Sequence, residues 1–77
     1  MPSAISASEP SWIEAADLQG RPIWSRTLTP GEVVALEGQA GFKLTIGNAA
    51  ATQVRWRGQP VELAAVTRDN VARLELK

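Results

Sequence analysis

Two stretches of strict apolar–polar alternation constrain the fold of this chain more than any other feature. Residues 42–46 (FKLTI) alternate Phe, Leu and Ile with Lys and Thr, and residues 52–57 (TQVRWR) show the same period. Successive side chains of a strand point to opposite faces, so a period of two residues is that of a half-buried strand. The centre of the chain, which carries its only Phe, therefore predicts β-strands with one face in a core.

Turn-forming residues divide the flanking sequence into further short strands. We predict turns at residues 17–20, 29–32, 47–48 and 57–58, and strands at 12–16, 22–28, 33–37, 60–63 and 71–77. No segment has a convincing helical period, although residues 64–70 have room for one helical turn. Turns spaced by roughly 8 to 12 residues are typical of sandwiches and small barrels. We therefore predict an all-β fold, a small antiparallel, Ig-like β-sandwich of about seven short strands.

Two of these turns carry a specific expectation about the backbone. Gly47-Asn48 is expected to end the central strand because both residues tolerate positive φ. Arg57-Gly58 is expected to form a tight turn in which Arg57 is strained, because a side chain at positive φ is sterically costly.

The chain has room for one domain. Its 77 residues lie within the usual size of a single small domain. Residues 1–10 (MPSAISASEP) consist largely of Ser, Ala and Pro, and they lack both periodicity and the apolar bulk that would order them. We predict a flexible linker remnant at residues 1–10 and the β-sandwich domain at residues 11–77.

The composition excludes several classes of function. The chain has no Cys and no His, which removes disulfides, thiolate nucleophiles, imidazole bases and the usual zinc ligands. Eight Lys or Arg balance eight Asp or Glu, so the broad positive field that attracts nucleic acid is missing. The chain has no apolar run of about 20 residues, the length that spans a bilayer, and its start does not resemble a signal peptide. We therefore expect no metal, no cofactor and no nucleic acid bound by this fragment.

The sequence does not indicate a catalytic site. Glu14, Asp17, Asp69 and Glu75 are the carboxylates that could serve acid–base chemistry, but no spacing places two of them together. Gly47-Asn48 lacks the glycine spacing and the following helix of a phosphate loop. We interpret it, with Asp69-Asn70, as a turn whose side chains bind the backbone. The prediction is that this chain is not an enzyme.

Six short motifs occur in an order that resembles one known family. They are the SWIE of residues 11–14, the turn at 17–20, the PGE of 30–32, residues 42–49, the GQPVEL of 58–63 and the NVARL of 70–74. Together they resemble the C-terminal extracytoplasmic domain of the RodZ family of bacterial cell-shape proteins, over residues 11–76. The chain departs from the family at Arg57, where Asn is common before Gly, and at Trp24 and Trp56, where Phe and Tyr are common.

The resemblance implies a biological context. Members of the family have a cytoplasmic helix-turn-helix domain, one transmembrane helix, a Pro/Ser/Ala-rich linker and this β domain outside the bacterial inner membrane. The resemblance implies that the cytoplasmic part, absent from this chain, binds the actin-like MreB filament. It also implies that the periplasmic part contacts wall-elongation membrane proteins, namely a penicillin-binding protein and a RodA-type protein. The function expected from it is a membrane-anchored scaffold for rod shape, and the family has no catalytic residues to transfer.

Four residues are the candidates for a partner-binding surface: Trp12, Arg55, Arg57 and Arg73. Trp12 is on the strand face opposite Ile13, and it is either an exposed anchor or a lid over the edge of the core. The three arginines are expected to form one patch, which is either a docking surface for an acidic partner or a solvated face paired with Glu62 or Glu75. Trp24 and Trp56 share strand faces with apolar residues and are predicted to lie in the core.

Two other functions remain as alternatives at this stage. One is a sandwich that binds carbohydrate or peptidoglycan through the Trp and Arg surface. The other is a purely structural spacer.

Overall fold

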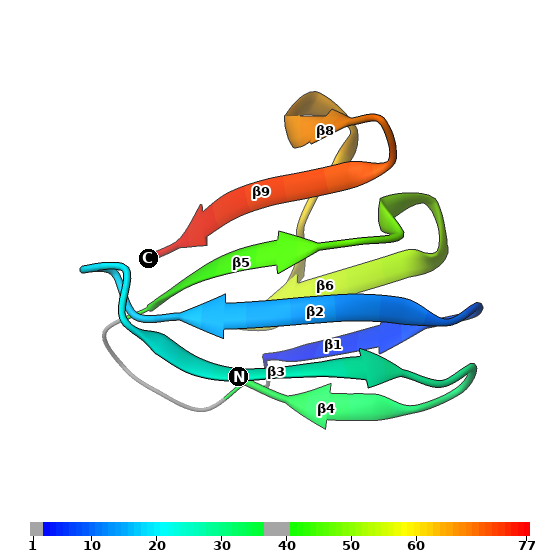
Figure 1. The fold of residues 1–77 in the computed structure, drawn as a ribbon, viewed down its shortest axis with the longest axis horizontal. Helices are drawn as coiled ribbons and strands as arrows, with labels where there is room; N and C mark the ends of the chain where they lie inside the picture. Colours follow the sequence, from blue (N-terminus) through cyan, green and yellow to red (C-terminus); the bar gives the residue numbers. More distant parts are fainter. Residues whose placement is uncertain (1–2, 37–40) are drawn as a thin grey trace.

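Two antiparallel sheets pack against each other in the computed structural model, which describes residues 3–36 and 41–77 (Figure 1). The strands are β1 (Ala4–Ala7), β2 (Ser11–Ala16), β3 (Pro22–Leu28), β4 (Val33–Ala35), β5 (Phe42–Ile46), β6 (Thr52–Trp56), β7 (Gln59–Pro60), β8 (Thr67–Arg68) and β9 (Val71–Leu76). Two short 3₁₀ turns, η1 (Ala49–Ala51) and η2 (Ala64–Val66), complete the elements. One sheet has the order β4-β1-β6-β7 and the other β3-β2-β5-β9-β8.

The predicted all-β class and the antiparallel two-sheet architecture are confirmed, but the predicted number of strands is wrong. The described residues form nine strands, because β1 and β8 were not predicted. The predicted strands at 22–28 and 42–46 match β3 and β5 residue for residue. The predicted strand at 33–37 ends at Ala35, with Glu37 outside the described residues, and the one at 60–63 is reduced to Gln59–Pro60.

The prediction of a flexible linker at residues 1–10 is wrong for β1. Ala4–Ala7 pair with β4 on one side and with β6 on the other, so β1 lies inside the four-stranded sheet. Ile5 is fully buried, and its partners in register are Val34 and Val54. The short run of small residues has little local preference for a strand, and these long-range pairings order it instead. Residues 1–2 lie outside the described residues.

The turns follow their sequence signals, with one exception. Thr29–Glu32 is a type II turn, in which Pro30 precedes Gly31 at φ 85° and the Glu32 N–H donates to the Thr29 carbonyl at 3.0 Å. Arg57 has the expected positive φ of 52° in the turn that links β6 to β7. The exception is Asn48, whose φ is −136°, so positive φ is not what ends β5 at this residue.

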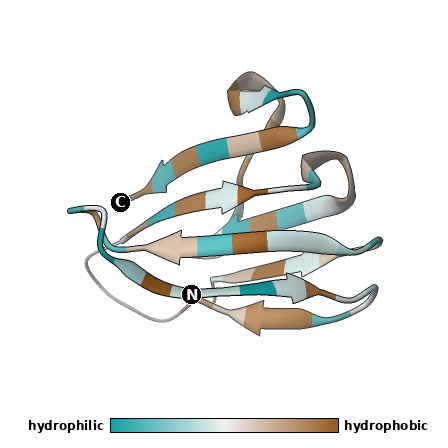
Figure 2. Cartoon of the chain, viewed as in Figure 1, coloured by the Kyte–Doolittle hydropathy of each residue, from teal (hydrophilic) through white to brown (hydrophobic). Residues whose placement is uncertain are grey.

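The core fills the space between the sheets with the inward side chains of both. Figure 2 shows apolar and polar residues alternating along the strands, as expected when one face of each strand is buried. Phe42, Leu44 and Ile46 form the centre of this core, as their alternation predicts. Trp24 and Trp56 are only partly buried and pack against its margin, so their predicted place in the core is corrected to its rim. Within the described residues no helix is long and apolar enough to cross a membrane.

Trp56 closes one end of the sandwich through three contacts. Its ring meets the Phe42 ring edge-on at a centroid distance of 5.9 Å, and its Nε1–H donates to the Lys77 carbonyl at 3.0 Å. The Arg57 guanidinium lies over the same ring, 5.1 Å from its centroid. These contacts fix Trp56 against the C-terminal end of β9.

Candidate functional site

Trp12 lies on the outer face of the five-stranded sheet and is 43% exposed. The alternation of β2 places it there, because its neighbour Ile13 is fully buried in the core. We call this side of the sheet the Trp12 face. Its members are the outward side chains of four strands: Trp12, Glu14, Ser25, Thr27, Lys43, Thr45, Arg73 and Glu75.

One flank of Trp12 has no neighbouring side chain because Gly47, the residue directly after β5, lies beside it. The Gly47 N–H donates to the Trp12 carbonyl at 2.7 Å. A Cβ at Gly47 would lie 3.4 Å from the Trp12 Cβ and 3.3 Å from its carbonyl oxygen. Gly47 therefore keeps the cross-strand flank of the indole free of a neighbouring side chain, and a larger residue there would crowd it.

Arg73 shares the Trp12 face, two strands away. The register places Glu14 opposite Thr45, and Thr45 opposite Arg73. Neighbouring strands are about 4.8 Å apart, so the backbones at Glu14 and Arg73 are about 10 Å apart. No ion pair involves Arg73 within residues 3–36 and 41–77.

The structure does not bring the three arginines into one patch, which corrects the sequence interpretation. Arg55 projects from the outer face of β6 in the other sheet, and its guanidinium donates to the Gly58 carbonyl at 3.0 Å rather than to a carboxylate. Arg57 lies beyond the end of β6, in the turn, and stacks on Trp56. A pattern within one strand shows which residues share its face, but it does not show which sheet the next strand joins.

A groove that the sequence did not reveal runs beside β9. Its volume is about 810 Å³, and it is lined by apolar Leu74, Val61 and Val66 with Lys43, Arg73, Lys77, Glu62 and Glu75 among its polar side chains. Val66 is 41% exposed. The apolar lining depends on η2 lying near β9, and no local periodicity in residues 61–66 predicts that arrangement.

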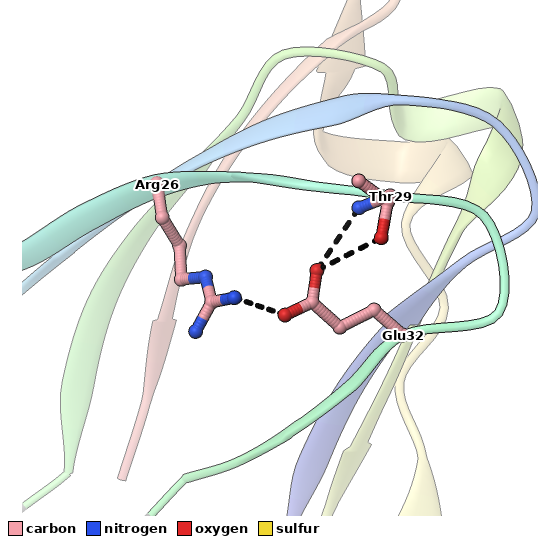
Figure 3. A network of polar contacts seen from close by, with 3 residues as sticks. All are labelled: Arg26, Thr29 and Glu32. Atoms are coloured by element: carbon pink, nitrogen blue, oxygen red, sulfur yellow. Dashed lines mark hydrogen bonds and ion pairs between the residues drawn. The ribbon is translucent and has the colours of Figure 1, made fainter.

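The opposite edge of the same sheet carries a polar network (Figure 3). The Glu32 carboxylate accepts hydrogen bonds from the Thr29 N–H at 3.0 Å and the Thr29 hydroxyl at 3.2 Å, and it pairs with the Arg26 guanidinium. The Thr29 N–H is the main cause that lowers the pKa of Glu32, and the charge of Arg26 adds to it. The network fixes the turn between β3 and β4.

The carboxylates considered for catalysis stay apart or serve structural roles. Asp17 caps its own turn, accepting from the N–H groups of Gln19 and Arg21, both at 2.9 Å. Glu75 pairs with Lys77 at 3.5 Å. In the part of the chain that the structure describes, no three His, Cys, Asp or Glu residues are grouped as metal ligands would be.

The model of the RodZ C-terminal domain family matches residues 4–75, which includes β1 and ends within β9. No solved structure matches the chain.

Proposed function

Because the chain belongs to the RodZ C-terminal domain family, we propose that it is the extracytoplasmic interaction module of a membrane-anchored cell-shape scaffold. The family is a scaffold-type domain and not a known enzyme family. The family match is the observation that carries the proposal, since it extends over nearly the whole chain. In this proposal the domain is periplasmic and does not catalyse a reaction.

The surface of the domain supports a role in binding. An indole that is 43% exposed on an ordered strand offers a rigid, largely apolar contact, and Trp is enriched among the residues that dominate protein interfaces. The Trp12 face also carries both signs of charge, in Glu14, Lys43 and Arg73. We assign partner contact to this face, with wall-elongation membrane proteins as the partners. The cytoplasmic part of the full protein would supply the link to MreB.

A deletion in cells tests the proposal. The codons for residues 4–76 are removed from the chromosomal gene of a bacterium that encodes this chain, and the rest of the gene is left intact. The proposal expects rods of altered width, or mislocalised wall-synthesis enzymes, at an unchanged level of the truncated protein. Rods of normal width under all growth conditions would show that the domain does not serve cell shape.

A further inference from the structure

Glu14, Thr45 and Arg73 stand in one row across three neighbouring strands of the Trp12 face. The register pairs Glu14 of β2 with Thr45 of β5, and Thr45 with Arg73 of β9. Each of the three follows a buried residue in its strand, so all three side chains point outward. Figure 1 shows β2, β5 and β9 side by side in this order. The row therefore presents a carboxylate at one end, a hydroxyl in the middle and a guanidinium at the other end.

The two charges of this row have no partner within the described part of the chain. Neither Glu14 nor Arg73 forms an ion pair or a side-chain hydrogen bond in residues 3–36 and 41–77. Both residues are exposed. Charges of opposite sign at fixed places on a surface select a partner whose charges are placed in the complementary way. The row therefore favours a ligand with a cation at one end and an anion at the other.

The adjacent row of the same face balances its own charges. Lys43 of β5 stands opposite Glu75 of β9, and opposite charges in such cross-strand pairs attract each other. Glu75 also pairs with Lys77 at 3.5 Å. A partner gains less from charges that neighbours already compensate. The row of Glu14 and Arg73 is therefore the charged part of the face that is available to a partner.

The free flank of Trp12 provides an apolar contact beside this row. Trp12 comes two residues before Glu14 in β2, so both side chains point to the same side, about 7 Å apart along the strand. Gly47 comes two residues after Thr45, and the side chain that it lacks leaves a gap against the indole. An aliphatic side chain placed over Gly47 would fill this gap. The site thus has three contact points: the indole flank, the carboxylate and the guanidinium.

A second copy of the chain satisfies the charges but leaves the gap empty. If a second copy faced this sheet about an axis along β5, Glu14 of each copy would meet Arg73 of the other. The same rotation would set Gly47 against Gly47 of the second copy, so no side chain would enter the gap beside either indole. A segment of a different protein can supply both the charges and the missing side chain.

We propose that the Trp12 face binds a segment of a partner protein that presents one aliphatic side chain between a basic and an acidic side chain. The aliphatic side chain packs on the indole of Trp12 over Gly47, the basic one pairs with Glu14 and the acidic one pairs with Arg73. The Thr45 hydroxyl lies between the two charge pairs, where it can bind a backbone group of the segment. This inference names the chemistry of the partner for the interaction module proposed above and rests on that proposal.

NMR titration of the isotope-labelled 77-residue chain with four capped peptides tests each contact separately. The probe Ac-Lys-Ser-Leu-Ser-Glu-NH2 carries all three side chains on one side when it is extended. In the three control peptides Gln replaces Lys, Gln replaces Glu, or Gly replaces Leu. We expect the probe to shift the indole N–H signal of Trp12 and the amide signals of Thr45 and Gly47 most. Exposed charge pairs are weak, so the loss of either charge from the peptide should weaken binding by about two- to fivefold.

Three variants assign each preference to one residue of the face. Glu14→Gln should remove the preference for Lys over Gln in the peptide and keep the preference for Glu over Gln. Arg73→Gln should do the reverse, and Trp12→Ala should remove the preference for Leu over Gly. Gln53→Lys, on the outer face of β6 in the other sheet, raises the net charge as much as Glu14→Gln does and should change none of the preferences. If Trp12→Ala does not fold, the two charge variants decide, because they alter only exposed side chains.

Four outcomes would overturn the inference. They are equal binding of the probe and its controls, a charge preference that persists in the matching variant, shifts centred on the four-stranded sheet, and no shifts at several millimolar peptide. Shifts of the same signals when the chain alone is concentrated would overturn it in favour of a second copy. Shifts by a muropeptide but not by the peptides would overturn it in favour of a glycan. A negative titration combined with a cell-shape defect in the deletion strain would refute this contact and leave the proposed function standing.

Discussion

Asn70 donates a hydrogen bond from its Nδ2 to Asn48 Oδ1 at 2.8 Å, joining two turns that are 22 residues apart in the chain. Asn48 Nδ2 also donates to the Pro10 carbonyl at 3.0 Å, and Asn70 Oδ1 accepts from the Ala50 N–H at 2.7 Å. The pair therefore links the approach to β2, the turn after β5 and the turn before β9. This confirms the interpretation of both asparagines as backbone-binding turn residues.

Removing the Asn70 side chain should destabilise the domain without straining its backbone. Asn70 has φ of 63°, which glycine adopts freely, so Asn70→Gly removes the hydrogen bonds and keeps the turn. We expect a loss of about 1–3 kcal/mol in the free energy of unfolding, measured by urea denaturation. The control Asp69→Gly, at a similar φ, should lower the free energy of unfolding much less. Equal effects of the two substitutions would contradict a structural role for the Asn48–Asn70 pair.

Gly41→Ala should be among the most damaging single substitutions. Gly41 has φ of 99°, and a Cβ there would lie 2.1 Å from the Leu76 carbonyl oxygen, so the backbone of β9 would have to move. Gly20→Ala is the matched control, because Gly20 has a similar φ of 91° but nothing within 4 Å of its Cβ position. We expect backbone strain in Gly20→Ala to lower the free energy of unfolding by about 1–3 kcal/mol, and Gly41→Ala to lower it by more. Thermal melts of both variants measure the difference. A similar melting temperature for the two variants would refute the close approach of Gly41 to Leu76.

Ile5→Ala tests whether residues 4–7 belong to the fold. Ile5 is fully buried between β4 and β6, so its truncation should cost about 2–5 kcal/mol. In a domain of this size that lowers the melting temperature by roughly 8 °C or more. Val33→Ala, at a site that is 65% exposed, should change stability by no more than about 0.5 kcal/mol. A melting temperature of Ile5→Ala equal to that of the wild type would instead support a flexible linker at these residues.

Glu32 should make stability depend on pH in the acidic range. Its pKa is lowered in the folded state, chiefly by the Thr29 N–H, so the folded chain holds the proton less tightly than the unfolded chain. The stabilisation is complete above the ordinary glutamate pKa of about 4.3 and is lost as the pH falls through the lower folded value. Between about pH 5 and pH 3, the free energy of unfolding should fall less for Glu32→Gln than for the wild type. An unchanged pH profile in Glu32→Gln, compared with the exposed control Glu9→Gln, would contradict the role of this network.

The sequence was sufficient to predict a strand and its buried face where the local residue pattern alone determines them. Phe42–Ile46 alternates strictly and ends at Gly47, and its boundaries and its buried face were both predicted. The outward position of Trp12 likewise follows from the burial of Ile13 in the same strand. Both conclusions need only the period of a strand.

The remaining features depend on contacts between distant residues. β1 is ordered by partners in β4 and β6, and nothing in the sequence AISA indicates them. Arg73 and Arg55 both alternate outward, yet they belong to different sheets, and only the strand order reveals this. β8 pairs with only the first two residues of β9 because η2 ends at Val66, directly before Thr67, and nothing local in the sequence sets that length.

The most direct test of the central claim, that this domain acts through its exposed surface, is the width of cells whose only copy of the full-length protein carries Trp12→Ala. Val33→Ala, at an exposed apolar position of β4 in the other sheet, is the control away from this face. Thermal melts of the isolated chains first establish that both variants remain folded. The account predicts altered width for Trp12→Ala at a normal protein level and normal width for Val33→Ala. The comparison is made in a strain whose shape is disturbed by the deletion of residues 4–76. If a folded Trp12→Ala protein gives cells of normal width in that strain, the claim is contradicted and a structural spacer is favoured.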